Sequence, residues 1–305
     1  MEQKNTDSTN IPPSPVQPTV NLPLAYALGL IGVTIFGATL PVTRIALVDF
    51  SPWFITFARA LMAGSVAILW LLLTRKRLSN PANFQLFISG LFLVIGFPAF
   101  MAIALQTVPA SHGGVVLGFL PLATAIAARL VGNEKPSPRF WLLSILGASV
   151  VVSYAYFSQN TQEEAGFAPG DFWLLLAGMS ASTGYALSGK LSRNMPGYEV
   201  IFRSLILNIP IVLIGALWTY EDRFLSPSIT GTFALAYLGF FSMLIGFFAW
   251  NTALAMGGIA RIGQIQLLQT FVTLAFAALL LAETIDATTI ATAIAVTAIV
   301  ALTRK

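Results

Sequence analysis

The stretch Leu24–Ile45, LAYALGLIGVTIFGATLPVTRI, decides the fold class of this chain. A transmembrane helix needs about 20 apolar residues, and this segment supplies them with a single charged side chain, Arg44, close to its end. The same pattern returns along the rest of the chain, in segments near 52–73, 84–105, 109–131, 138–157, 170–190, 197–218, 231–253, 258–281 and 284–302. The pattern therefore predicts an all-α membrane protein with ten transmembrane helices.

The composition excludes a water-soluble fold. Of 305 residues, 56% are hydrophobic and only 9% are charged, whereas soluble domains carry roughly 25% charged residues. The chain has no cysteine, one histidine and 12 acidic residues. These numbers exclude disulfides and thiolate zinc sites, and they leave little material for an acid–base pair. We therefore expect no catalytic residues, no metal and no cofactor, and we do not expect an enzyme.

Residues 1–22 are polar and rich in proline, which predicts a disordered cytoplasmic tail. The tail lacks the charged start and short apolar core of a signal peptide. The first span is therefore expected to remain in the mature protein.

Basic residues predict the orientation. With the N-terminus inside, only Arg44, Arg59 and Arg223 lie on the outer side, and the other basic residues fall in cytoplasmic segments. Because cytoplasmic loops are enriched in Lys and Arg, this asymmetry predicts an N-in, C-in protein of a bacterial inner membrane. It also accounts for the net charge of +4 without nucleic acid. The expected partners are the lipid bilayer and a small-molecule substrate, and a homodimer is left open.

The chain matches itself at an offset of 149 residues (283 minus 134), which brings Glu134 onto Glu283 and Thr124 onto Thr273. The polar positions and the helix boundaries agree together. This predicts two repeats, residues 23–157 and 170–305, with five helices each. Because five is odd, the repeats enter the membrane in opposite directions, as in many secondary transporters.

Two stretches carry a resemblance to a known family. Phe36–Arg44, FGATLPVTR, resembles the first-helix signature of EamA-type proteins in the drug/metabolite transporter superfamily. Gly257–Glu283, a helix of small residues ending in LAET, is similar to the penultimate helix of that family. The resemblance covers nearly the whole chain after residue 22. It implies two five-helix EamA units around a central cavity, with activity as a metabolite exporter or facilitator.

These observations together predict a secondary transporter for a small amphipathic metabolite, an amino acid or a related compound. We expect efflux by alternating access of the two repeats. No phosphate-binding loop is present in the sequence, so ATP does not drive transport within this chain. A passive channel or facilitator, and an uptake permease for a vitamin, nucleoside or amine, are the alternatives.

Polar and aromatic side chains inside the spans are the candidates for substrate binding. They are Phe36, Thr39, Arg59, Phe100, His112, Tyr185, Trp250, Asn251, Gln266 and Gln269. The sequence leaves two interpretations of Arg59: a cation that faces the substrate, or a structural partner of Asp49 or of a helix carbonyl. The amides either hold helices together or line the cavity. His112 either takes part in transport or lies at an interface, and each aromatic side chain has packing as its alternative.

Overall fold

The computed structural model describes residues 21–78, 81–132, 138–157, 167–192, 195–257, 262 and 265–303, and these are helical or in turns, with no strand among them. Residues 1–20 of the predicted tail lie outside this range. The helices of the first half are α1 (Leu22–Ala46), α2 (Pro52–Thr74), α3 (Asn83–Gly90), η1 (Leu91–Gly96), α4 (Phe97–Ala104), α5 (Ala110–Val116), η2 (Leu117–Phe119), α6 (Leu120–Gly132) and α7 (Pro138–Phe157).

The helices of the second half are α8 (Pro169–Leu191), α9 (Gly197–Trp218), η3 (Asp222–Leu225), α10 (Ile229–Ala236), η4 (Tyr237–Gly246), α11 (Phe247–Gly257), η5 (Ile265–Leu267), α13 (Leu268–Leu281) and α14 (Ala287–Thr303). Where the structure describes their ends, the helical segments begin and end within about four residues of the predicted spans. Among the described residues, five helical segments are long and apolar enough to cross a membrane: Leu22–Ala46, Pro52–Thr74, Asn83–Ala104, Gly197–Trp218 and Ile229–Leu254.

Local signals in the sequence explain where α2 and α13 end or begin. Ser51 accepts a hydrogen bond from the N–H of Phe54 at 3.3 Å, and Pro52 occupies the first helical position, where its missing N–H costs nothing. Arg75 and Ala282 adopt left-handed backbone conformations, with φ of 52° and 53°, at the C-termini of α2 and α13. This conformation ends a helix by turning the chain away from its axis.

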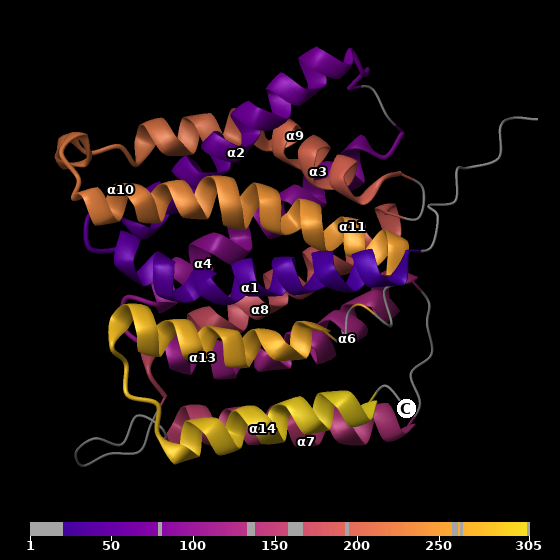
Figure 1. The fold of residues 1–305 in the computed structure, drawn as a ribbon, viewed down its shortest axis with the longest axis vertical. Coiled ribbons are helices and arrows are strands. Elements are labelled where there is room, and N and C mark those ends of the chain that lie inside the picture. Colours follow the sequence, from indigo (N-terminus) through magenta and orange to yellow (C-terminus); the bar gives the residue numbers. More distant parts are fainter. Residues whose placement is uncertain are drawn as a thin grey trace, which may run out of the picture.

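The packing of the helices is symmetric between the halves. In the first half α1 packs against α11 and α13, and its counterpart in the second half, α8, packs against α4 and α6. The counterparts α2 and α9 pack against each other, as do α7 and α14. Figure 1 shows these two pairs at opposite edges of the bundle, with α1, α4, α8 and α13 between them. This is the arrangement expected of two structural repeats related by a two-fold axis.

The helices are interrupted at related places in the two halves. The π-helical segments η1 and η4 break the third helix of each half, the 3₁₀ segment η2 breaks the fourth helix of the first half, and the 3₁₀ segment η5 directly precedes α13 in the second half. At the offset of 149 residues, Leu93 in η1 corresponds to Ser242 in η4, and Leu117 in η2 corresponds to Gln266 in η5. Interruptions of this kind are frequent at functional sites.

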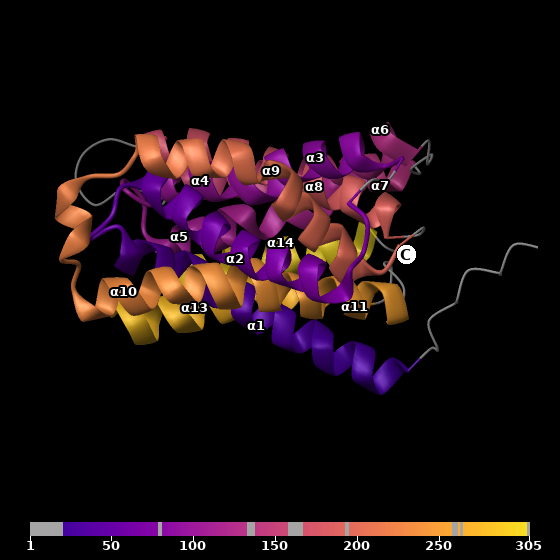
Figure 2. The ribbon, with the colours of Figure 1, turned by 90° about the horizontal axis from the view of Figure 1, so that it is seen from above.

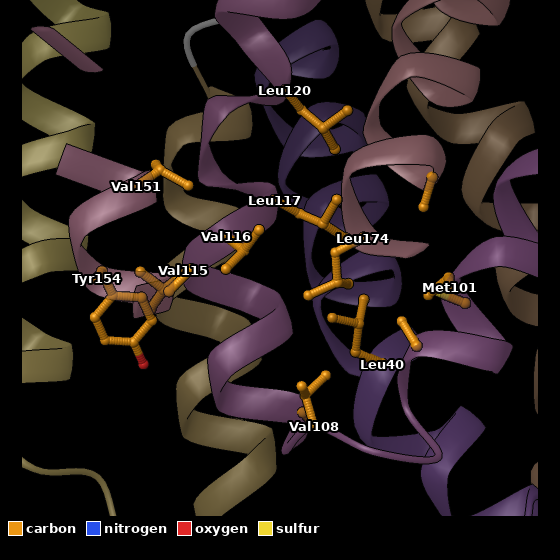
Figure 3. Packing of buried hydrophobic residues seen from close by; sticks show 14 of the residues in the cluster. Leu40, Met101, Val108, Val115, Val116, Leu117, Leu120, Val151, Tyr154 and Leu174 are labelled. Atoms are coloured by element: carbon orange, nitrogen blue, oxygen red, sulfur yellow. The ribbon is translucent and has the colours of Figure 1, made fainter. Parts of the chain in front are cut away.

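One apolar core joins the halves. Leu40 of α1, Leu117 of η2 and Leu174 of α8 are each at most 5% exposed, and Figure 3 shows them converging.

Figure 2 shows that the first turns of α1 extend beyond the rest of the bundle. The start of α1 and the end of α14 lie at the same end of the bundle (Figure 1).

Candidate functional site

A cavity lies between the two halves, at the breaks in the third helices. It is lined by residues from α1, α2, α4, α6, α8, α11 and α13 and from both π-helical segments. These residues are Phe36, Thr39, Leu40, Arg59, Leu93, Phe97, Pro98, Leu120, Tyr185, Ser242, Met243, Phe247 and Gln269. We call this space the central cavity. The space in it that the centre of a water molecule can reach is about 20 Å³, which is enough for a water molecule, so a substrate would need a wider conformation.

A second cavity adjoins the first and shares Leu40, Leu120 and Gln269 with it. We call it the adjoining cavity. Its lining comes from both 3₁₀ segments and from α1, α5, α6, α13 and α14: Leu40, Gly114, Leu117, Gly118, Leu120, Gln266, Leu267, Gln269, Thr270, Thr273 and Thr297. Residues of all four π-helical and 3₁₀ segments η1, η2, η4 and η5 therefore line one or the other of the two cavities.

A chain of hydrogen bonds holds Arg59 in the wall of the central cavity. The Nη2 group of Arg59 donates to Ser242 Oγ at 2.8 Å, and Ser242 Oγ lies 2.8 Å from Thr39 Oγ1. Thr39 in turn donates to the carbonyl of Ile35 at 3.1 Å. These bonds hold the guanidinium of Arg59 to η4 and, through Ser242, to α1. Arg59 is only 2% exposed, and it belongs to the lining of the cavity.

The structure brings five of the ten predicted site residues together in the central cavity. Phe36, Thr39, Arg59, Tyr185 and Gln269 line it. Another predicted site residue, Gln266, lines the adjoining cavity together with Gln269.

The other four predicted residues lie in helix contacts outside both linings. Phe100 stacks on Trp173 with ring centroids 5.8 Å apart. The side chain of Asn251 donates to the carbonyl of Gly197 at 3.2 Å and ties α11 to α9. The indole of Trp250 is 4% exposed and belongs to the apolar cluster around α1.

His112 lies at the start of α5, where its Nε2 is 2.6 Å from Asp171 Oδ1. Both side chains are buried, and the imidazole stacks on the ring of Tyr154. Asp171 also accepts a hydrogen bond from the N–H of Ala168 at 2.9 Å. His112 thus joins the first half to α8 of the second half.

Asp49, one of the two structural partners considered for Arg59, bonds elsewhere. Its carboxylate accepts hydrogen bonds from the N–H and the hydroxyl of Ser228 at 3.1 and 2.6 Å. This contact ties the α1–α2 turn to the start of α10.

Another polar cluster lies at the opposite end of α2. Glu199 pairs with Lys76 at 2.6 Å and with Arg203 at 2.7 Å. Arg203 also donates to the carbonyls of Arg77 and Leu78. The sequence places Arg203 among the basic residues of the cytoplasmic segments, and the structure shows it within a network that joins the halves.

Sequence reasoning missed Ser242, the residue that orients Arg59. A lone serine in the apolar run Tyr237–Gly246 was the available signal. Serine is common at helix contacts in membranes, so its identity alone does not distinguish a cavity from a packing face. Leu93 and Met243 were also missed, because an apolar residue in an apolar span carries no signal that it lines a cavity.

The fold and the cavity define a class of protein: a multi-pass membrane transporter built from two helical repeats. The model of the EamA-like transporter family matches residues 23–155 and again 168–304. The chain belongs to the EamA-like transporter family.

Individual relatives agree with this assignment. The chain is 40% identical over 281 residues to the "Uncharacterized transporter YdeK" of Bacillus subtilis (strain 168), covering 91% of this chain and 96% of that protein. It is 25% identical over 284 residues to the "Probable amino-acid metabolite efflux pump" of Salmonella typhimurium, covering 89% and 91% of the two chains. A solved crystal structure superposes with a TM-score of 0.60 at 20% identity, covering 91% of this chain and 98% of the other, which shows a shared fold.

Proposed function

We propose that this protein is a secondary transporter that moves a small amphipathic metabolite, an amino acid or a related compound, out of the cell by alternating access. In this proposal ten helices cross a bacterial inner membrane with both termini inside. One observation carries the proposal: the central cavity lies where the two halves meet, and its walls include repeat-related helix breaks, with Leu93 and its counterpart Ser242 both on the lining.

Helix breaks at a site between repeats suit a carrier. Broken helices near the middle of the membrane expose backbone and side-chain polar groups to a substrate. They also let the two ends of one helix move separately. Because each half contributes equivalent breaks, exchanging the conformations of the halves would exchange the side on which the cavity opens.

Polar contacts between the halves close the bundle on both sides of the cavity. Toward one end, Glu199 pairs with Lys76; toward the other, Asp171 pairs with His112. Each contact joins a residue of the first half to one of the second. In an alternating-access cycle these two contacts would open in turn, one on each side of the membrane.

The chemistry of the lining supports an amphipathic substrate. Phe36, Tyr185 and Phe247 supply apolar walls, with the rings of Phe36 and Phe247 5.0 Å apart. Arg59 and Gln269 supply polar groups that fix orientation. The name of the Salmonella relative, "Probable amino-acid metabolite efflux pump", supports both the substrate class and the direction.

Counterflow in proteoliposomes tests the proposal. Purified protein is reconstituted and loaded with one unlabelled compound, and the same compound is supplied outside in labelled form. The panel contains amino acids, vitamins, nucleosides and amines. We expect transient accumulation of label for amino acids, which only a carrier produces.

Protein-free liposomes provide the control for leakage. Equilibration of label without transient accumulation would show a channel and contradict the proposal. Counterflow confined to vitamins, nucleosides or amines would support a carrier with another substrate. No movement of any compound by folded protein would contradict transport itself.

A further inference from the structure

The guanidinium of Arg59 is a buried cation whose hydrogen bonds are incomplete. Its Nη2 group bonds to Ser242, but its Nε and Nη1 groups have no hydrogen-bond partner. The side chain is 98% buried (2% exposed) and lines the central cavity. Buried donors are almost always paired, so these free N–H groups indicate a missing ligand.

Arg203 of the same chain shows what a purely structural buried arginine does here. Its Nε and Nη2 groups bond to Glu199 Oε1, and its Nη1 group donates to the carbonyls of Arg77 and Leu78. Every nitrogen of that guanidinium is used. Arg59 differs because two of its three guanidinium nitrogens have no partner, although its side chain belongs to the lining of the central cavity.

Arg59 also has no counter-ion in the part of the chain that the structure describes. The described ion pairs join Lys76 and Arg203 to Glu199, and His112 to Asp171. An unpaired buried charge costs several kcal/mol, and the cost is large within a membrane. An anion that enters the cavity would remove this cost.

The amide of Gln269 provides a complementary group on the same lining. Its Oε1 atom is buried and has no hydrogen-bond partner. An amide oxygen accepts hydrogen bonds, so it suits an N–H donor. The apolar walls formed by Phe36 and Tyr185 lie on the same cavity.

We propose that the unpartnered Nη1 group of Arg59 donates a hydrogen bond to the carboxylate of the substrate, while Gln269 accepts a hydrogen bond from its ammonium or amide N–H. The ligand class is an amphipathic monocarboxylate with an N–H donor, such as an apolar α-amino acid. The inference rests on the proposed function and deepens it.

The charge of the lining selects a monocarboxylate over a phosphate. Arg59 is the single charged side chain among the residues that line the two cavities. A phosphate monoester carries about −1.5 to −2 charges at neutral pH, which one guanidinium does not neutralise. A carboxylate carries one negative charge, which one guanidinium neutralises, and it accepts charge-assisted hydrogen bonds.

Matched compounds test the carboxylate separately from the rest of the ligand. The probes are leucine and phenylalanine, their methyl esters, their decarboxylated amines and their deaminated acids. Two measurements are made on the full-length protein: competition with counterflow, and the shift in melting temperature that each probe causes in detergent. The second measurement reports binding whether or not transport occurs.

The variants are Arg59→Gln, Arg59→Lys, Gln269→Leu and Arg44→Gln. Arg44 lies outside both linings, and its guanidinium donates to the carbonyl of Val108. Arg44→Gln removes the same charge as Arg59→Gln at this other place, so it is the matched control. Arg59→Lys keeps the charge, so it tests the carboxylate contact even where Arg59→Gln does not fold.

We expect the wild type and Arg44→Gln to prefer the amino acids to their esters and amines by about tenfold to hundredfold, the usual worth of a hydrogen bond to a charged group. Arg59→Gln should abolish this preference, and Arg59→Lys should keep part of it. Gln269→Leu should lower the preference for amino acids over deaminated acids while leaving the preference over esters unchanged.

Equal binding of acids, esters and amines by the wild type would overturn the inference, as would an equal loss of all probes in Arg59→Gln. Counterflow of amines without counterflow of acids would leave the proposed function standing and overturn the inference. Arg59-dependent stabilisation by acids without any counterflow would leave the inference standing and overturn the proposed function. If no probe caused either stabilisation or counterflow, both the inference and the proposed function would be overturned.

Discussion

The carboxylate of Glu283, which precedes α14, accepts hydrogen bonds from the backbone N–H and the hydroxyl of Ser111 at 2.8 and 2.6 Å. Its other oxygen accepts a bond from the N–H of Ala110 at 2.8 Å. A residue of the second half therefore caps α5 of the first half, with a negative charge at the positive end of the helix. The sequence singled out Glu283 as a repeat position, and the structure gives it a role that joins the halves.

Replacing Glu283 by Ala should lower the free energy of unfolding by about 1–3 kcal/mol, because buried N–H groups at the start of α5 lose a charged acceptor. Glu283→Gln should lose less, since one oxygen still accepts. Denaturant unfolding in detergent micelles measures both variants. Equal stability of Glu283→Ala and the wild type would contradict the capping role.

The buried pair of His112 and Asp171 should be coupled in stability. Removing one member of a buried pair leaves the other unpaired and typically costs about 3–5 kcal/mol. We therefore expect His112→Ala and Asp171→Ala each to be strongly destabilising. The double variant should lose clearly less than the sum of the two. A double-mutant cycle in micelles measures this difference.

The same variants separate a structural role of His112 from a role in binding. Because His112 lies outside both cavity linings, His112→Ala should leave the order of substrate preference unchanged in competition assays. Additive losses of stability in the cycle, or a changed order of preference, would contradict this interpretation.

Gly37 marks a close approach of α1 to α13, two helices from different halves. A Cβ atom at residue 37 would lie 2.5 Å from Cγ1 of Val272 and 3.3 Å from the backbone nitrogen of Thr273. A β-branched side chain and backbone have little room to move. Gly37→Ala should therefore lower the free energy of unfolding by about 1–3 kcal/mol.

Gly147→Ala in α7 is the matched control. Its closest contact would be Cδ1 of Leu122 at 2.9 Å, the end of a flexible side chain that can shift at lower cost, and Cγ2 of Ile299 is farther away at 3.3 Å. Thermal unfolding in micelles compares the two variants. A larger loss for Gly147→Ala would contradict the argument for a rigid contact between α1 and α13.

Much of the fold could be predicted because the physics of a bilayer is restrictive. Apolar runs of sufficient length alternate with proline and charge, and these breaks place the ends of the helices. The same restriction predicted Arg59 and Gln269 as cavity residues, since a polar side chain inside a span must find a polar environment.

The remaining site residues could not be predicted from the same signals. Every face of a buried membrane helix is apolar, so the hydrophobic period does not tell a cavity face from a packing face. Phe100 and Trp250 were assigned to the site on this ambiguity, and the structure places them in helix contacts. The pairing of His112 with Asp171 was missed because the two residues are 59 positions apart and no pattern in the sequence links them.

The absence of cysteine from the sequence makes the proposed topology directly testable. A single introduced cysteine is the only thiol in the chain, so a membrane-impermeant maleimide reports its side of the membrane. Val48, in the turn after α1, is 80% exposed, and Lys190, near the end of α8, is exposed as well. If both termini are inside, Val48→Cys should be labelled on intact spheroplasts, whereas Lys190→Cys should be labelled only after the membrane is permeabilised. The cysteine-free parent controls for reaction at other groups. The reverse pattern would invert the orientation, and labelling of both variants from one side would contradict the crossing of α1 to α8 in the proposed order.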